Sequence, residues 1–154
     1  MIETVRQALL AAGHEDSIAQ FPAGTRSAQD AAEAVGCSVA QIAKSIVFRA
    51  GDAVVLVIAS GAHRIDRQKV SAILGRPVKS ADPAWVQERT GFAVGGVAPL
   101  GHACPVTTVI DEALLPLTPL WAAAGSPAHV FSTDAARLVA MTGGVVGAVK
   151  QEEG

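Results

Sequence analysis

Lys44 stands near the start of the apolar run QIAKSIVF, where a charged side chain needs a partner. The alternation of residues predicts a strand in which Lys44, Ile46 and Phe48 share one face. An unpaired ammonium group is so costly to bury that it must reach solvent, bind an anion or lose its proton. Lys44 is therefore either a lysine whose head extends into water or an anion-binding group. Asp66 or Asp111 could supply that anion from within the chain.

The stretch TGFAVGGVAPLGH, residues 90–102, contains four glycines. Glycines let the backbone approach a ligand closely and turn several N–H groups toward one point. The chain has neither GxGxxG at the opening of a helix nor GxxxxGK(S/T), which excludes both common nucleotide fingerprints. Two interpretations remain open. The loop is a backbone cradle for a phosphate or an acyl-transfer oxyanion, or its glycines only satisfy tight turns.

His102 and Cys104 are two residues apart, so in an extended segment their side chains point to the same side. Nothing near them in the sequence orients the histidine, and a cysteine among apolar neighbours is usually an inert small hydrophobe. A Cys104 nucleophile is therefore kept only as an alternative. No metal site is predicted, because the histidines lack a recurring ligand spacing. The four histidines are His14, His63, His102 and His129.

Composition favours one compact domain spanning residues 1–154, since half of the 154 residues are hydrophobic and only 17% are charged. No apolar stretch approaches the roughly 18 residues that would span a bilayer. The N-terminal stretch has the spacing of an amphipathic helix with an early acidic residue, which is unlike a signal peptide. The two cysteines show no paired spacing, as in a reducing compartment. We therefore expect a cytoplasmic protein without membrane contact.

A local basic run interrupts a chain whose net charge is −2. Between Arg64 and Lys79 five cationic side chains accompany a single acid, Asp66. From charge alone a solvated helix face is the simpler interpretation of this run, and a polyanion-binding face is the alternative.

Caps, turns and hydrophobic periods predict alternating helices and strands. Helices are predicted at residues 2–12, 27–36, 66–74, 82–89 and 133–141. Strands are predicted at residues 17–21, 44–49, 53–60, 106–111, 119–124, 128–132 and 144–150. The strand at residues 53–60 is apolar on both faces, which is typical of a central strand, and it forms a hairpin with the strand before it. The fold class is therefore α/β or α+β.

Five segments together resemble the successive motifs of the YbaK family, also called the prolyl-tRNA synthetase associated or editing domain. They are QIAKSIVF, VLVIASGAHRID with Lys69 beyond it, TGFAVGGVAPLG, TTVIDEAL and AAGSP. The resemblance extends from about residue 31 to residue 150, in the order and spacing of the family. It implies an α+β fold with a mixed, partly bifurcated sheet flanked by helices. It also implies a free-standing deacylase of mischarged aminoacyl-tRNA, with tRNA for proline carrying a small non-cognate amino acid as the expected substrate.

The resemblance also implies roles for individual residues. Lys44 would contact the terminal end of the tRNA, and Gly95 and Gly96 of the GGVAP loop would offer backbone donors to the ester carbonyl. The attack would be substrate-assisted, so the protein mainly positions and polarises. Residues expected to line the amino-acid pocket are Ser60, Gly61, Val97, Pro99, Gly101 and Ser126. Residues expected to hold the acceptor stem are Arg64, Arg67 and Lys69.

Ser126 departs from the pattern of the alanine-specific branch, in which a histidine would precede the proline of the late loop. The amino acid that is removed is therefore left open.

The expected partner is the acceptor end of an aminoacyl-tRNA, and prolyl-tRNA synthetase is a further candidate partner. The expected assembly is a monomer or a homodimer. No cofactor is expected. The alternatives are a non-catalytic module that binds tRNA or a synthetase, and a hydrolase of another ester or thioester that uses Cys104.

Overall fold

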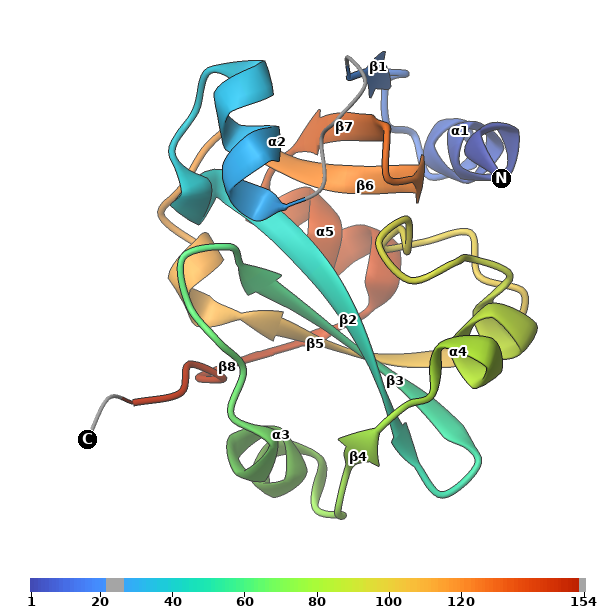
Figure 1. The fold of residues 1–154 in the computed structure, drawn as a ribbon, viewed down its shortest axis with the longest axis vertical. Helices are drawn as coiled ribbons and strands as arrows, with labels where there is room; N and C mark the ends of the chain where they lie inside the picture. The colour runs from blue at the N-terminus through green and yellow to red at the C-terminus, as the bar shows by residue number, and fades with distance from the viewer. Residues whose placement is uncertain (22–26, 153–154) are drawn as a thin grey trace.

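The computed structural model describes residues 1–21 and 27–152, and there one eight-stranded sheet is accompanied by five α-helices (Figure 1). The helices are α1 Ile2–Ala11, α2 Ala28–Val35, α3 Arg67–Leu74, α4 Pro83–Thr90 and α5 Ala135–Thr142, with short 3-10 turns η1 Val39–Gln41 and η2 Glu112–Leu114. The strands are β1 Ala19–Gln20, β2 Ile42–Ala50, β3 Ala53–Ser60, β4 Lys79–Ser80, β5 Val106–Asp111, β6 Leu120–Ser126, β7 His129–Thr133 and β8 Val145–Gly147.

The sheet is mixed and it branches at β2. Its main path runs β1-β7-β6-β2-β3-β5-β8, with antiparallel pairs such as β2–β3 and parallel pairs such as β3–β5. The start of β2, at Ile42 and Ala43, pairs with β6, whereas its end, at Phe48 and Arg49, pairs with β4. One strand thus feeds two branches, and the predicted α+β fold with a partly bifurcated sheet is confirmed.

Strand β3 lies at the centre of the core and is buried on both faces. Leu56 belongs to an apolar cluster that includes Val5 of α1 and Val86 of α4. Val57 points the other way and packs in a second cluster with Val70 of α3. Two covered faces explain why this strand is an unbroken apolar run rather than an alternating one. The prediction of a central strand in a hairpin with β2 is confirmed.

The helix ends follow the capping signals in the sequence. Ser27 accepts a hydrogen bond from the N–H of Asp30 at the start of α2, and Asp66 accepts from the N–H of Gln68 at the start of α3. The last predicted helix is displaced: α5 begins at Ala135, after Asp134 as its cap, rather than at residue 133. Among the residues that the structure describes, every helix is too short or too polar to cross a bilayer.

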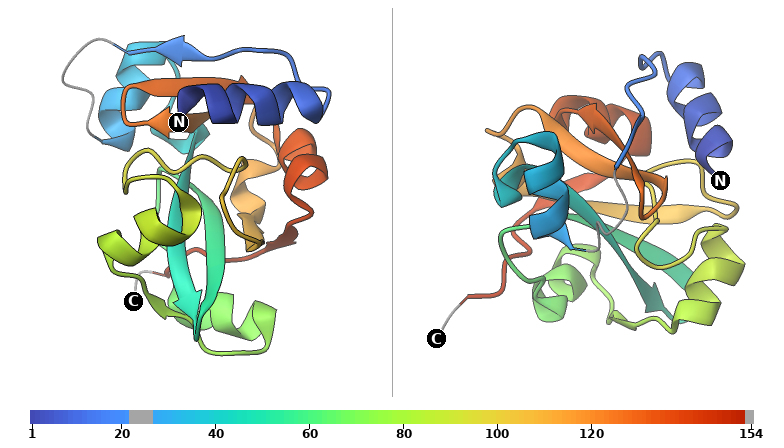
Figure 2. Two further views of the ribbon diagram at one scale, coloured as in Figure 1. Left: turned by 90° about the vertical axis from the view of Figure 1, so that its right-hand side faces the viewer. Right: turned by 45° about the horizontal axis from the view of Figure 1, so that its top comes forward.

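The segment that connects α4 to β5, residues 91–105, is called the glycine loop below. Figures 1 and 2 show it as a yellow-green to yellow trace between α4 and the β6–β7 hairpin. It therefore faces β2 near the point where the sheet branches. This arrangement places the two sequence features that could do chemistry, Lys44 on β2 and the glycines of the loop, around a common space.

Candidate functional site

A cavity of ≈ 430 Å³, called the central pocket below, lies between α2, β2, α4, the glycine loop and the β6–β7 hairpin. Much of its wall is small and apolar. Of the residues predicted from sequence to form the site, four line this pocket: Lys44, Gly95, Val97 and Ser126. Three separate elements supply these four residues, so the fold brings together groups that are far apart in the sequence.

Lys44 extends from the first half of β2 into the wall of the pocket. Its Nζ donates a hydrogen bond of 2.7 Å to the backbone carbonyl of His63. Burial lowers the pKa of the Lys44 ammonium below its ordinary value, the charge of Arg64 lowers it further, and Asp111 opposes both effects. One hydrogen bond leaves the other two ammonium protons available to a ligand. Lys44 is therefore a cation held in place at a partly desolvated position.

Asp111, weighed above as a partner for Lys44, acts on it through His63. Its Oδ2 lies 2.5 Å from His63 Nε2 and also accepts the N–H of Ser60 over 3.0 Å. Its Oδ1 accepts the N–H of Ala113 over 3.0 Å, and the residue is 1% exposed. A carboxylate with this many donors fixes the β3–α3 connection, and with it the carbonyl that holds Lys44. Asp66 caps α3 instead.

The glycine loop makes close contact with the β6–β7 turn. Gly95 has φ +93°, a conformation that favours glycine, and its N–H donates to no other described residue. The N–H of Gly96 already donates to Ala93 O over 2.9 Å. A Cβ on Gly96 would lie 2.8 Å from Ser126 Cα, so only glycine allows this approach. Gly95 is thus the glycine whose N–H remains available for an oxyanion.

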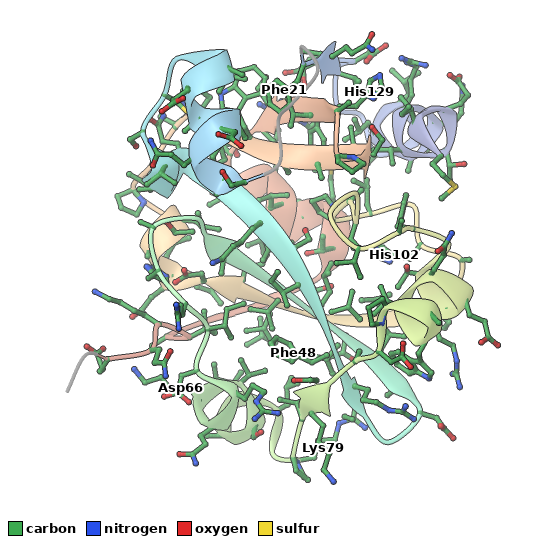
Figure 3. The ribbon with its side chains drawn as sticks, in the orientation of Figure 1. Phe21, Phe48, Asp66, Lys79, His102 and His129 are labelled. Atoms are coloured by element: carbon green, nitrogen blue, oxygen red, sulfur yellow. The ribbon has the colours of Figure 1, made fainter. Side chains whose placement is uncertain are left out.

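His102 stabilises the glycine loop through two contacts within it. Its Nε2 donates a hydrogen bond of 2.7 Å to Ala98 O, and its ring meets Phe92 edge-on with centroids 5.1 Å apart. Burial lowers the pKa of His102, and the hydrogen bond to Ala98 opposes that shift only in part. The imidazole is therefore held neutral within the loop, on which Figure 3 labels it.

Cys104 lies outside the central pocket, in a shallower hollow that it shares with Arg89 and Thr107. Burial raises the pKa of its thiol, although the charge of Arg89 acts in the opposite direction. A raised thiol pKa keeps the sulfur protonated and weakly nucleophilic.

Ser126 and His129 form a contact that the sequence analysis missed. Ser126 Oγ lies 2.7 Å from His129 Nδ1, and both residues line the central pocket. The signal was present as a hydroxyl and an imidazole three residues apart around Pro127. The strands predicted at residues 119–124 and 128–132 imply a turn between them, but their predicted ends do not pair Ser126 with His129 as the structure does.

Ser60, Gly61 and Gly101 were also predicted to line the amino-acid pocket, but they do not line the central pocket. Ser60 is 1% exposed and donates its hydroxyl to Ala40 O over 2.8 Å. Gly61 packs so tightly that a Cβ there would lie 2.7 Å from Val39 O. Gly101 faces α1.

Pro99 is buried beside the lining residue Val97 and does not itself line the pocket. The predicted tRNA-binding residues lie in and before α3. Arg64 and Arg67 are exposed, whereas Lys69 Nζ donates to Lys150 O over 2.7 Å and pairs with Glu152 over 3.3 Å. The two arginines are therefore more available to a polyanion than Lys69.

No group of three or more His, Cys, Asp or Glu side chains within residues 1–21 and 27–152 is arranged to hold a metal ion. Among the lining residues that the structure describes, the groups that could do chemistry are the Lys44 ammonium, backbone N–H groups, and the Ser126 hydroxyl with the His129 imidazole. That set suits polarisation of a carbonyl and acceptance of a proton.

Comparisons with known proteins agree on one family. The model of the aminoacyl-tRNA editing domain matches residues 22–141. The uncharacterized protein YwhH of Bacillus subtilis is 32% identical over 126 residues, which cover 81% of this chain and 80% of YwhH. A crystal structure described as "a putative trans-editing enzyme for prolyl tRNA synthetase" has a TM-score of 0.93 at 39% identity, over 98% of this chain and 97% of that one. Proline–tRNA ligase of Thermosipho melanesiensis is 29% identical over 77 residues, which are 49% of this chain and 14% of the ligase.

Proposed function

Because this chain belongs to the aminoacyl-tRNA editing domain family, we propose that it hydrolyses the ester bond of mischarged aminoacyl-tRNA in trans. The proposed substrate is tRNA for proline that carries a small non-cognate amino acid. The observation that carries the proposal is that one pocket is lined both by Lys44 and by Gly95, whose N–H has no acceptor among the described residues. The likeness to the protein described as "a putative trans-editing enzyme for prolyl tRNA synthetase" supports the mode of action.

In the proposed complex the ester carbonyl lies against the glycine loop. The N–H of Gly95 donates to the carbonyl oxygen as negative charge develops on it, which stabilises the tetrahedral intermediate. Gly96 keeps the loop in contact with the β6–β7 turn and Val97 adds an apolar wall. A ribose hydroxyl next to the ester orients the attacking water, so the substrate contributes to its own hydrolysis.

Lys44 offers its remaining ammonium protons to the terminal phosphate of the tRNA. A charge-assisted hydrogen bond to phosphate is stronger than a neutral one, and partial burial strengthens it further. The charge of Arg64 acts on Lys44, and both Arg64 and Arg67 are exposed, so these two arginines would contact the acceptor stem. Binding should then weaken as salt rises.

The walls of the central pocket suit a small amino acid. Ala31, Ala43 and Ala123 line it, and its ≈ 430 Å³ falls within the usual range of ligand pockets, about 300–1,000 Å³. An apolar wall separates substrates that differ by one methylene by only about 1–3 kcal/mol. We therefore propose a class of substrates, small aminoacyl esters, rather than one amino acid.

A panel of aminoacyl-tRNAs tests the proposal. Samples of tRNA for proline are charged separately with proline, alanine, cysteine, serine or threonine. Loss of the amino acid from each sample is then followed with and without the protein. We expect faster loss of at least one non-cognate amino acid and no effect on prolyl-tRNA. If every aminoacyl-tRNA loses its amino acid no faster with the protein than in buffer alone, the proposal is overturned and a non-catalytic tRNA-binding role is favoured.

A further inference from the structure

Strand β2 is paired along both of its edges at its two ends, but along only one edge in its middle. One edge pairs with β3 over nearly the whole length of the strand. On the other edge, β6 pairs at Ile42 and Ala43, and β4 pairs at Phe48 and Arg49 (Figure 1). Within the described part of the chain, residues 44–47 have no strand beside them on that edge. This stretch is called the open edge below.

The phase of the β2–β3 pairing determines which backbone groups face the open edge. Successive residues of a strand direct their N–H and C=O groups to opposite edges. The C=O of Ile42 accepts the N–H of Gly61, just after β3, so the even-numbered residues of β2 face β3. The odd-numbered residues face the other edge, where β6 and β4 pair. The backbone groups of Ser45 and Val47 therefore face the open edge.

The open edge carries an acceptor and a donor without partners in the wall of the central pocket. The C=O of Ser45 and the N–H of Val47 point the same way, and neither has a hydrogen-bond partner among the described residues. Both residues line the central pocket. Ser45 Oγ is likewise a buried polar atom without a partner in the described part of the chain. Because buried polar groups are nearly always paired, this set is suited to a ligand.

Apolar side chains lie on both faces of the open edge. By the alternation of the strand, Ile46 points to the same face as Phe48, and it is 39% exposed. Val47 points to the opposite face, where it belongs to one apolar cluster with Val97 of the glycine loop. Val94 of that loop is 59% exposed and lines the central pocket together with Ile46. A flat ring in the plane of the strand edge would therefore meet apolar side chains on both of its faces.

The order of the hydrogen-bonding groups fits one edge of an adenine. Adenine carries an amino group beside an unprotonated ring nitrogen, which is N1 on one edge and N7 on another. The amino group can donate to the C=O of Ser45 while the ring nitrogen accepts from the N–H of Val47. An ammonium group would match only the carbonyl. An oxyanion would not match, because the N–H groups of Ser45 and Val47 are about 6.5 Å apart along the strand.

We propose that the open edge of β2 is the subsite for the terminal adenine of the tRNA, an inference that rests on the proposed function. The amino acid of an aminoacyl-tRNA is esterified to the ribose of a terminal adenosine, so this base lies near the ester. Lys44, the proposed phosphate ligand, precedes Ser45, and Gly95, the proposed carbonyl donor, follows Val94. One nucleotide thus contacts β2 and the glycine loop through its phosphate, base and ester. Unpaired RNA ends are commonly recognised through base edges and ring faces.

Nucleotide titrations followed by amide NMR test the subsite without any hydrolysis. Adenosine 5′-monophosphate is compared with inosine 5′-monophosphate, whose base has an oxygen in place of the amino group. That oxygen would face the C=O of Ser45, acceptor against acceptor, so we expect the inosine nucleotide to bind about tenfold more weakly or worse. The adenosine nucleotide should move the amide proton of Val47 downfield, as a new hydrogen bond does. Equal affinities, no binding of the adenosine nucleotide, or binding without that shift would overturn the subsite.

Val47→Pro removes the proposed donor and leaves the β2–β3 ladder intact. Proline is tolerated on a strand edge where its missing N–H is not part of a ladder. We expect the affinity for adenosine 5′-monophosphate to fall by about tenfold or more. Val47→Ala is the matched variant, because it also changes the buried side chain but keeps the N–H, so its affinity should fall clearly less. Equal losses in the two variants would remove this N–H from the subsite. Urea denaturation checks that both are folded, and if the proline variant is not, the wild-type titrations decide.

An aminoacylated acceptor stem that ends in inosine instead of adenosine links the subsite to the reaction. At low substrate concentration its hydrolysis should be about tenfold slower or more than that of the adenosine form. A wild type that deacylates both forms equally and binds both nucleotides equally would overturn the subsite alone. A wild type that prefers the adenosine nucleotide but deacylates no member of the panel would overturn the proposed hydrolysis alone.

Discussion

The backbone carbonyl of His63 holds Lys44 Nζ at 2.7 Å, while the ring of the same histidine binds the buried carboxylate of Asp111. The position of the pocket's lysine is thus set by the chain segment that leaves β3, not by β2 alone. A direct ion pair with Asp111 would have neutralised the ammonium within the protein. The carbonyl instead orients the charge and leaves it to a ligand.

Lys44→Met should abolish function without weakening the fold. A lysine whose pKa is lowered by folding binds its proton more weakly when folded, so its protonation costs stability in full below the folded pKa. This cost disappears only as the pH rises past the higher pKa of the unfolded chain. Methionine keeps the apolar stem and removes this cost. We expect deacylation to fall by about 100-fold or more and Tm to stay equal or rise.

Thermal unfolding and deacylation are measured on the same preparation of Lys44→Met. Lys69→Met is the control, because Lys69 pairs with the C-terminal segment and lies outside the pocket. Its rate at low salt should change less than threefold. A Lys44→Met variant that deacylates at the wild-type rate would remove Lys44 from the site.

Asp111→Ala should destabilise the protein and displace Lys44 together. It deprives His63, Ser60 and Ala113 of an acceptor at a position that is 1% exposed. Unpaired buried donors cost about 1–3 kcal/mol each, so we expect the free energy of unfolding to fall by about 3 kcal/mol or more. Urea denaturation measures it.

Asp66→Ala is the matched comparison for Asp111→Ala. Asp66 is also an aspartate that binds backbone N–H groups, but as the cap of α3 at a partly exposed position. Loss of such a cap costs about 1 kcal/mol. Equal losses of stability in the two variants would show that the Asp111–His63 contact contributes little.

The sequence predicted the elements well where a local signal defines them. Asp66 and Gly75 mark the ends of α3, and the apolar run of β3 marks a strand covered on both faces. The two-residue strand β4 was missed because its pairing with the end of β2 depends on the path of the chain after α3. No periodicity can develop in two residues.

The candidate site was also predicted only where a local sequence signal marks its residues. Lys44 was identified as a charge in an apolar run, whereas Gly95 was named only through the family resemblance, and both line the pocket. Ser60 is the last residue of β3 and Gly61 follows it, but their polar groups form hydrogen bonds with the backbone around them. The Ser126–His129 contact could not be derived, because it depends on a turn geometry that a serine, a proline and a histidine do not specify by themselves.

His102 should make stability depend on pH. Its folded pKa is lowered by burial, so below about pH 6.5, where the unfolded chain takes up a proton, the folded protein resists it. The stabilising effect of the neutral ring is therefore complete above that value and is lost as the pH falls toward the folded pKa. We expect the wild type to lose more Tm than His102→Gln between about pH 7.5 and about pH 5.

Glutamine is the suitable replacement because its amide N–H can still donate to Ala98 O. The comparison with wild type also cancels the contributions of all other groups whose protonation changes in this range. Identical pH profiles of Tm for the two proteins would contradict the buried, neutral state of His102.

Gly96→Ala should distort the candidate site, because the new Cβ would clash with the backbone of Ser126. Its Cβ would lie 2.8 Å from Ser126 Cα and 3.1 Å from Ser126 N, and neither neighbour is a flexible side-chain end. The glycine loop and the β6–β7 turn must therefore move apart. Overpacking of this kind costs about 1–3 kcal/mol, and the movement displaces Gly95. We expect deacylation per folded molecule to fall by about tenfold or more, since a 1 Å misplacement of reacting groups can cost about 100-fold.

Gly75→Ala provides the comparison because it changes a backbone without a clash. Gly75 has φ +73° and open space around its Cβ position, so alanine there costs about 1–2 kcal/mol of conformational strain. The two variants should thus lose similar stability in urea denaturation, yet only Gly96→Ala should lose activity at a temperature where both are folded. If Gly96→Ala deacylates as fast as Gly75→Ala, contact between the glycine loop and Ser126 is not needed for the reaction.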